Sequence, residues 1–265
     1  MPELPEVEAY RRLAVEALDR PIASVSLYDP RFLRGATSLR QLKRILVGAS
    51  FRAARRIGKL LVLDLAGTPA ATDHRLGLRF GMTGSLFVDS HSAVDELIYS
   101  SKARGAQWDR FAVGLADGGD LVVHDPRILG GVILDPDETA LGPDALALTP
   151  AQLRQALEGS AAPLKARLMD QARIAGIGNL LADEILWRAS LAPNRRAGSL
   201  TPAETRRLHH HLRTTLTELS ARGGSHMGDL MVAREKGGRC PRDGAALMRS
   251  TVGGRTTYWC PRHQK

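Results

Sequence analysis

The spacing of apolar residues near the start of the chain predicts an amphipathic helix. Val7, Tyr10, Ala14 and Leu18 recur at steps of three and four residues, which places them on one face of a helix. The opposite side is basic. We therefore expect a helix from Pro5 to about Leu18 that buries this apolar face.

The pattern changes after Ile22, where short runs of strand-forming residues follow one another until about Asp125. The clearest pair is 111–115 and 120–124, joined by the turn sequence Ala-Asp-Gly-Gly at 116–119, which predicts a hairpin. A strand-rich first domain follows from the whole set. The predicted strands are 22–27, 50–54, 60–65, 76–80, 85–88, 110–115 and 121–124.

A turn-rich acidic stretch from Asp135 to Pro150 separates this region from a helical one, and we interpret it as an interdomain connection. Thr149 is suited to cap a helix, and Thr201 with Glu204 forms a capping-box sequence. The expected helices are 150–157, 163–171, 179–189 and 202–221.

Composition adds a nucleic-acid partner to this picture. The chain has a net charge of +9 and is 43% hydrophobic, as expected of a globular protein that binds a polyanion. Only 5% of its residues are aromatic, which argues against recognition by stacked aromatic platforms. With no apolar run of about 18 residues and no leader-like segment, we expect a cytoplasmic, nucleoid-associated protein that does not contact membranes.

The first residues, Met-Pro-Glu-Leu-Pro-Glu, carry candidate chemistry. If Met1 is removed, Pro2 has a free α-amine, whose reference pKa of about 7.7–8 leaves part of it unprotonated at neutral pH. Glu3 lies next to it as a general acid or base, and such a pair suits attack on a sugar carbon through a Schiff base. The alternative is an ordinary helix start, with Pro5 at the first helical position.

This opening resembles that of the formamidopyrimidine-DNA glycosylase / endonuclease VIII family, and further motifs match the family in its order along the chain. The resemblance implies an α+β protein in which an N-terminal helix and β-sandwich precede a helix-two-turn-helix domain and a zinc-finger-like β-hairpin. The corresponding ranges are 1–134, 135–148 for the connection, 149–222, and 223–265 for a lesion loop and the hairpin.

In the first domain, the resemblance implies DNA contacts from five residues. Lys59, in the turn Arg-Arg-Ile-Gly-Lys at 55–59, matches a lysine that contacts phosphate. Met82 matches a methionine that fills the gap left by an extruded base, and Arg79 stands where the family usually has histidine. Arg127 matches the arginine facing the opposite base, and Leu129 replaces the adjacent phenylalanine wedge. The alternative for residues 55–59 is a solvated basic turn, and the alternative for Met82 is a position in the core.

In the second domain, Asn179 ends the glycine-bearing segment 172–179 and matches a phosphate-clamping asparagine. Exposed N–H groups at the following helix start favour an anion, although Asn179 also fits a structural cap. Lys165 matches a helix lysine that lies near DNA, and Arg255 matches the finger arginine that grips phosphate at the lesion.

The C-terminal module departs from the family's four-cysteine finger. Cys240-Pro-Arg-Asp243 and Cys260-Pro-Arg-His263 keep its spacing but replace two thiolates with carboxylate and imidazole, both recognised zinc ligands. We expect structural zinc held by these four residues. The alternative is a metal-free finger held by Leu247, Tyr258 and Trp259.

Together, these features imply a monomeric repair enzyme acting on damaged double-stranded DNA. It removes oxidised or ring-opened bases through a Schiff base on Pro2, with Glu3, Lys59 and Arg255 in the catalytic set, and cleaves the strand by β/δ-elimination. Ile128, Leu129 and a short 222–239 segment favour, as an alternative, oxidised pyrimidines or bulky adducts. A binder of damaged DNA without catalysis is the alternative of another class.

Overall fold

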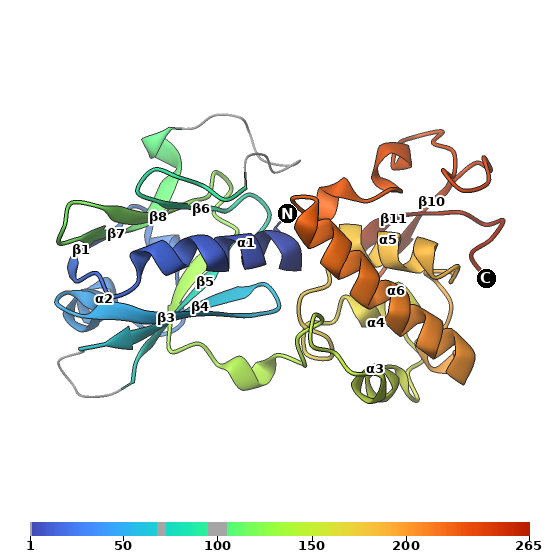
Figure 1. The fold of residues 1–265 in the computed structure, drawn as a ribbon, viewed down its shortest axis with the longest axis horizontal. Helices are drawn as coiled ribbons and strands as arrows, with labels where there is room; N and C mark the ends of the chain where they lie inside the picture. The colour runs from blue at the N-terminus through green and yellow to red at the C-terminus, as the bar shows by residue number, and fades with distance from the viewer. Residues whose placement is uncertain (1, 68–72, 95–104) are drawn as a thin grey trace. The chain divides into compact units, whose positions relative to one another are not determined.

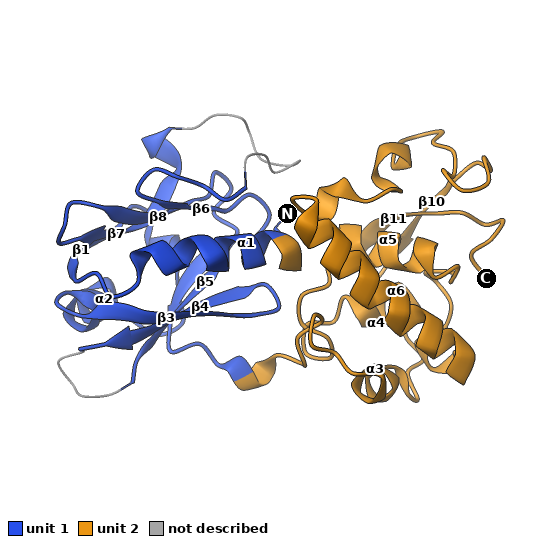
Figure 2. Ribbon diagram, viewed as in Figure 1, with its two compact units in different colours: residues 1–2, 6–138 blue, residues 3–5, 139–265 orange. Residues whose placement is uncertain are grey.

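The computed structural model describes residues 2–67, 73–94 and 105–265, which form two compact units (Figure 2). Unit 1 comprises Pro2 and residues 6–138, and unit 2 comprises residues 3–5 and 139–265. Helix α1 (Leu4–Ala14) begins with residues of unit 2 and continues in unit 1. It is shorter than predicted because Val15–Ala17 form a 3-10 turn.

Unit 1 contains two sheets (Figure 1). The five-stranded sheet has the order β2-β9-β5-β4-β3 and is antiparallel except for β2 and β9, which pair in parallel. Its strands are β2 (Leu33–Arg34), β3 (Ser50–Ile57), β4 (Leu60–Ala66), β5 (Arg75–Arg79) and β9 (Gly131–Leu134). The four-stranded sheet has the order β1-β7-β8-β6. Its strands are β1 (Ile22–Leu27), β6 (Ser85–Val88), β7 (Asp109–Leu115) and β8 (Asp120–His124).

The core of unit 1 collects the alternate apolar side chains of both sheets, as a sandwich requires. Strand β8 illustrates the pattern, because Leu121 and Val123 are buried while Val122 between them is only half-buried. Helix α1 adds Val7 and Tyr10 to this core. The Tyr10 ring lies 4.6 Å from that of Phe80.

In the described part of unit 1, two strands and one α-helix were not predicted. Strand β2 has only two residues and β9 begins with glycine, so neither carries a period-two signal. Helix α2 (Leu39–Leu46), capped by Ser38, buries Leu42, Ile45 and Leu46. The predicted hairpin of β7 and β8 is confirmed.

Unit 2 is built from four α-helices, several short 3-10 turns and a C-terminal hairpin. The helices are α3 (Pro150–Leu157), α4 (Leu164–Leu168), α5 (Asn179–Arg188) and α6 (Pro202–Ala221). Thr149 and Thr201 cap α3 and α6 through complete capping boxes, which confirms both helix starts. The expected α+β class is therefore confirmed for the described residues.

Helix α4 is shorter than the predicted helix 163–171, and the Gln171 side chain gives the reason. Its amide nitrogen donates to the carbonyls of Met169 (2.7 Å) and Ile177 (2.9 Å), and its oxygen accepts from Gly176 N–H (3.0 Å). The side chain thus closes the segment leading into α5 as a loop.

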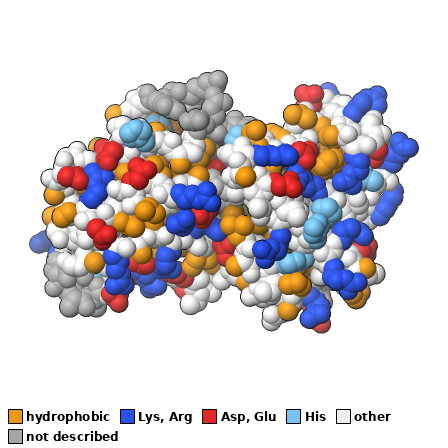
Figure 3. All heavy atoms as spheres, viewed as in Figure 1, with side chains coloured by type: hydrophobic (Ala, Val, Ile, Leu, Met, Phe, Trp, Pro, Cys, Tyr) orange, Lys and Arg blue, Asp and Glu red, His pale blue; other side chains and the backbone are white. Residues whose placement is uncertain are grey.

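Strands β10 (Met248–Val252) and β11 (Arg255–Trp259) form the C-terminal hairpin. A small core of Trp187, Leu230, Cys240 and Cys260 lies beside it. On the face shown in Figure 3, basic side chains lie interspersed with acidic ones. Among the described helices, none is long and apolar enough to span a membrane.

Candidate active site

Glu3 is the buried acid at the centre of the candidate site. Its side chain is 0% exposed. The carboxylate accepts hydrogen bonds from the N–H groups of Gly178 (2.9 Å), Leu180 (2.9 Å) and Leu181 (3.1 Å). These donors form the N-terminus of α5, where the helix dipole stabilises negative charge. The anion expected at this helix start is therefore the protein's own carboxylate.

Two backbone features bring Glu3 to this position. The N–H of Leu4 donates to the carbonyl of Gly176 at 3.2 Å, which fixes the chain beside the loop before α5. At Gly178, an added Cβ would lie 2.2 Å from the Glu3 carboxyl carbon. Only glycine leaves room for the carboxylate so close to the helix start. Met1, whose removal would expose the Pro2 amine, lies outside the described residues.

Asn179 is the first residue of α5 but does not cap it. The N-cap residue is Gly178, which has no side chain to cap the helix, and the N–H groups there donate to Glu3 instead. The buried side-chain oxygen of Asn179 has no hydrogen-bond partner among the described residues. The Asn179 carboxamide therefore does not act as a helix cap, which was the alternative role suggested by the sequence.

Lys165, for which the resemblance implied a place near DNA, is a buried residue of unit 2. It is 0% exposed, and its ammonium lies 2.7 Å from Asp183 Oδ1. The same group donates to Thr257 Oγ1 (2.7 Å) and the Thr256 carbonyl (3.3 Å). Burial lowers the pKa of Lys165, and the Asp183 carboxylate opposes this shift. In this structure the ammonium is used inside unit 2 and is not presented to a ligand.

The buried lysine instead supports the hairpin that carries Arg255. Thr256 and Thr257, which it contacts, directly follow Arg255 in β11, and Thr257 Oγ1 donates to the Arg255 carbonyl at 3.0 Å. Arg255 itself is exposed. Asp183 also accepts from Tyr258 N–H at 3.2 Å and pairs with Arg234. Helix α5 thus binds both Glu3 and the strand presenting Arg255.

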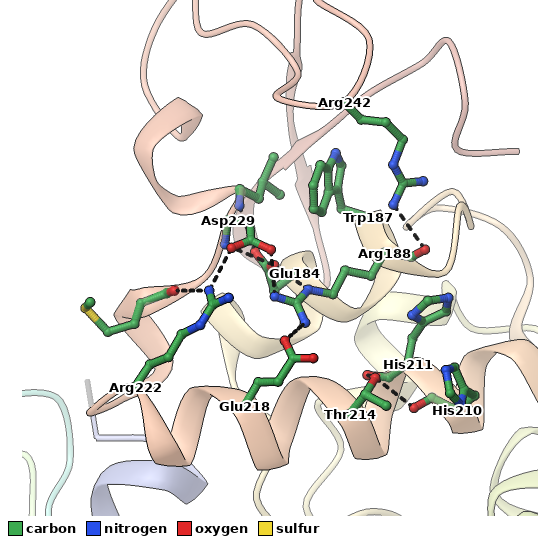
Figure 4. A network of polar contacts seen from close by, with 12 residues as sticks. Glu184, Trp187, Arg188, His210, His211, Thr214, Glu218, Arg222, Asp229 and Arg242 are labelled. Atoms are coloured by element: carbon green, nitrogen blue, oxygen red, sulfur yellow. Dashed lines mark hydrogen bonds and ion pairs between the residues drawn. The ribbon is translucent and has the colours of Figure 1, made fainter.

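A second acid of α5, Glu184, fixes the chain that follows α6. Its carboxylate accepts from the N–H groups of Asp229 (3.1 Å) and Leu230 (2.9 Å). Arg188 joins Glu184 (2.7 Å) to Glu218 (2.5 Å) and Asp229 (2.8 Å) (Figure 4). The segment predicted to form the lesion loop is therefore attached to α5 by its backbone.

In unit 1, the cations expected to cluster at 55–59 have different surroundings. Arg55 pairs with Asp64 (2.7 Å) and Glu138 (3.0 Å), and Arg56 pairs with Glu8 of α1 (3.0 Å). Arg56 also donates to the Gly58 carbonyl (2.9 Å). The arginines thus hold the turn that carries Lys59, which is half-buried.

Met82, Arg127 and Leu129 come together in unit 1, on two loops that touch. Met82 is half-buried outside the core, and its sulfur lies 3.7 Å from Arg127 Nη1. An added Cβ at Gly81, whose φ is +57°, would lie 2.5 Å from the Leu129 backbone. Leu129 and Arg127 are exposed, as is Arg79 at the end of β5. Met82 is therefore not a residue of the hydrophobic core.

Asp125 joins these two loops. It is fully buried, and its carboxylate accepts from Thr83 Oγ1 (2.5 Å), Gly130 N–H (2.8 Å) and Arg127 N–H (3.2 Å). Sequence reasoning did not identify this role. Aspartate before a turn is nonetheless the type of residue that hydrogen-bonds backbone two positions on.

The candidate metal ligands also meet. Ligand atoms of Cys240, Asp243, Cys260 and His263 all lie within 4.8 Å of one another. His263 Nδ1 is 2.8 Å from Asp243 Oδ2 and 3.8 Å from Cys240 Sγ. The Ala245 N–H and His263, which hydrogen-bond its carboxylate, hold the pKa of Asp243 well below its usual range.

This donor set fits a tetrahedral metal ion. Zinc bound at about 2.0–2.3 Å separates its ligand atoms by roughly 3.3–3.8 Å. Cys260 Sγ lies 3.4 Å from Asp243 Oδ2, within that range. Both cysteines are free thiols. The group can therefore hold a metal ion with small side-chain adjustments.

Comparisons with known proteins agree with the geometry. Residues 1–132 match the formamidopyrimidine-DNA glycosylase N-terminal domain and residues 140–229 match the formamidopyrimidine-DNA glycosylase H2TH domain. The formamidopyrimidine-DNA glycosylase of Carboxydothermus hydrogenoformans is 36% identical over an alignment of 284 positions, gaps included, that covers 100% of both chains.

Crystal structures of the Lactococcus lactis Fpg protein are similar to this chain throughout. Its complexes with DNA containing N7-benzyl-Fapy-dG and with DNA containing an oxidised pyrimidine each give a TM-score of 0.83 at 26% identity, with 100% of both chains covered. With the buried Glu3, the two touching loops and the finger hairpin in place, the chain belongs to the formamidopyrimidine-DNA glycosylase family and is a DNA glycosylase of base excision repair.

Proposed function

We propose that the protein excises damaged bases from double-stranded DNA with Pro2 as the nucleophile and Glu3 as its acid. The observation that carries this proposal is the fixation of the Glu3 carboxylate by three N–H donors at α5. A carboxylate held in one orientation next to the terminal amine is prepared for proton transfer at one point in space.

The reaction follows from these two groups. The Pro2 nitrogen bonds to the anomeric carbon of the damaged nucleotide, and the base leaves with the electrons of the glycosidic bond and takes a proton from water. The Glu3 carboxylate accepts the proton that the Pro2 nitrogen loses and delivers it to the sugar ring oxygen as the ring opens to the iminium. The iminium that results acidifies the neighbouring sugar proton. Its loss breaks the carbon–oxygen bond to the 3′ phosphate, and a second elimination releases the 5′ phosphate.

DNA contacts would come from exposed or half-buried groups. Lys59, Asn179 and Arg255 bind phosphates, Arg79 adds a further cation, and Met82 fills the gap left by the extruded nucleotide. Arg127 faces the base opposite the lesion, with Leu129 as an apolar wedge. The contact between Met82 and Arg127 supports this arrangement, because both act at the same gap in the duplex.

The finger would bind zinc through Cys240, Asp243, Cys260 and His263. Zinc there would be structural, because it is held by four protein ligands. Mass spectrometry of the native protein tests this, and a mass increase of one zinc ion that is lost in Cys260→Ser is expected. An unchanged mass with a folded hairpin supports the metal-free finger.

Borohydride reduction with abasic-site DNA tests the nucleophile. We expect a covalent adduct with protein that mass spectrometry shows to lack Met1, and none with protein that carries an additional residue before Pro2, since its Pro2 nitrogen is an amide. Pro5→Ala is the matched control and should keep the adduct. Intact binding without any adduct would instead favour a non-catalytic binder of damaged DNA.

The lesion range is the second question. The Lactococcus lactis protein was crystallised with a bulky adduct and with an oxidised pyrimidine, and a similar tolerance here would fit a short segment attached to α5 by Glu184. Single-turnover excision on duplexes carrying ring-opened purines, oxidised pyrimidines and N7-benzyl adducts separates these substrates. Activity confined to ring-opened and oxidised purines would contradict the broad range.

A further inference from the structure

The loop formed by residues 125–130 is held by two arginines from outside it. Arg110 donates from Nε to the Asp125 carbonyl (2.8 Å) and from Nη2 to the Pro126 carbonyl (3.4 Å). Arg34 donates to the Ile128 carbonyl (3.2 Å) and twice to the Gly130 carbonyl (2.9 and 3.1 Å). Four of the six loop carbonyls are therefore bound by guanidinium groups.

The two arginines differ in setting but act on the same backbone. Arg110 is 8% exposed, lies over the Trp108 ring at 5.6 Å and also binds the Gln107 carbonyl (3.2 Å). Arg34 ends the two-residue strand β2, which pairs with β9 just beyond the loop. The loop is thus attached to a different strand on each side.

The loop also contains a conformation that needs external support. Ile128 has a φ of +55°, a region that a β-branched residue adopts at a cost of about 1–3 kcal/mol. Such a conformation persists only where surrounding contacts impose it. Arg34 binds the carbonyl of this residue, and Asp125 binds the N–H groups of Arg127 and Gly130. With these groups held, Arg127 and Leu129 point outward.

We propose that Arg34 and Arg110 are positioning residues that fix the 125–130 backbone and thereby set discrimination between the bases opposite the lesion. The inference rests on the proposed function, in which Arg127 faces that base. Each guanidinium acts through the loop and does not touch DNA. Discrimination depends on Arg127 having a single geometry, because a mobile arginine can hydrogen-bond several bases about equally well.

The experiment compares Arg34→Ala and Arg34→Lys with the wild-type protein. The same lesion is placed opposite each of the four bases, and single-turnover excision rates are measured. We expect the ratio of the fastest to the slowest rate to fall about tenfold in Arg34→Ala, which corresponds to about 1.4 kcal/mol. Arg34→Lys keeps one charged donor and should recover part of the ratio.

Arg31→Ala is the matched control, because Arg31 lies on the same segment but pairs only with Asp29 (2.7 Å) among the described residues. Its ratio should equal that of the wild type. Arg34→Ala with an unchanged melting temperature and an unchanged ratio would overturn the inference, as would a wild-type protein without opposite-base discrimination. Arg34 is exposed, so its replacement leaves the core intact. If Arg34→Ala nevertheless melts early, Arg34→Lys decides alone.

Failure of the proposed Pro2 chemistry can be told apart from failure of the positioning role of Arg34. A protein that forms no borohydride adduct refutes the Pro2 mechanism, and the positioning role is then tested by equilibrium binding to duplexes with an abasic analogue opposite each base. Loss of binding discrimination in Arg34→Ala supports the inference even then, and retained discrimination refutes it.

Discussion

At the scale of single residues, Glu3 occupies the place that a bound anion would otherwise take at the start of α5. Both of its oxygens accept backbone N–H groups, so the carboxylate cannot rotate without breaking a charge-assisted hydrogen bond. The same contacts that stabilise the fold therefore also orient the acid for chemistry.

Replacing Glu3 with glutamine tests both roles. The amide must present an NH₂ group to at least one backbone donor, and we expect unfolding free energy to fall by about 1–3 kcal/mol. Excision should slow by about 10²–10⁴, because the side chain no longer transfers a proton. Urea unfolding and single-turnover kinetics measure the two effects. Glu16→Gln, at an exposed position, is the control, and a fully active Glu3→Gln protein would refute the assignment.

We expect Lys165 to act as a structural cation, because its ammonium is buried against Asp183. In Lys165→Met, Asp183 keeps Arg234 and the Tyr258 N–H but loses its closest ammonium partner. Removing one member of a buried ion pair costs on the order of 3 kcal/mol, and hydrogen exchange in residues 248–259 should accelerate. Lys43→Met, on the exposed side of α2, should change neither quantity. Unaltered stability in Lys165→Met would contradict this role.

At the scale of elements, helix α5 does most of the positioning in unit 2. The N-terminus of α5 holds Glu3, its interior acids Asp183 and Glu184 hold the hairpin and the segment after α6, and Arg188 joins it to α6. One helix of ten residues thus organises unit 2. Helix α6 contributes rigidity through its capped start.

The cap of α6 predicts a pH dependence. Arg195, followed by Thr201, lowers the pKa of Glu204 to about 2 from 4.5. A depressed folded-state pKa contributes stability that is present above about pH 4.5 and is lost as pH falls towards 2. The difference in melting temperature between wild type and Glu204→Gln should therefore shrink across this window. Glu158→Gln serves as the control, and a difference that is constant from pH 5 to pH 2 would be inconsistent with the cap.

At the scale of the whole molecule, the net charge of +9 describes affinity for DNA but does not identify the contacts. Many arginines form ion pairs within the protein, as Arg55 and Arg56 do. The DNA contacts proposed here come from exposed or half-buried side chains, Arg255 among them.

The salt dependence of binding counts these contacts. Each phosphate contact contributes about 0.9 to the slope of log K against log salt, so Arg255→Ala should reduce the slope by about 1 and weaken binding to all sequences alike. Fluorescence anisotropy with an abasic-analogue duplex at several salt concentrations measures it. Arg40→Ala, exposed on α2, provides the comparison. An unchanged slope in Arg255→Ala would remove this arginine from the phosphate contacts.

What the sequence alone determined is local. The capping boxes at Thr149 and Thr201, the hairpin of β7 and β8 and the paired donor spacing of the finger follow from residues a few positions apart, or from a turn that joins them. Short-range geometry depends on the backbone and the nearest side chains, so a pattern of residue types suffices to predict it. The shorter α4 and the missed strands β2 and β9 show where such patterns are too weak.

Only the tertiary structure decided which distant groups meet. Glu3 and Gly178 are 175 positions apart. Neither local sequence indicates that the Glu3 carboxylate binds the N-terminus of α5. The burial of Lys165 against Asp183 and the binding of residues 125–130 by Arg34 and Arg110 are of the same kind. The partner of a charged group is set by which segments the hydrophobic core brings together, and a charge taken out of water requires a partner wherever the fold supplies one.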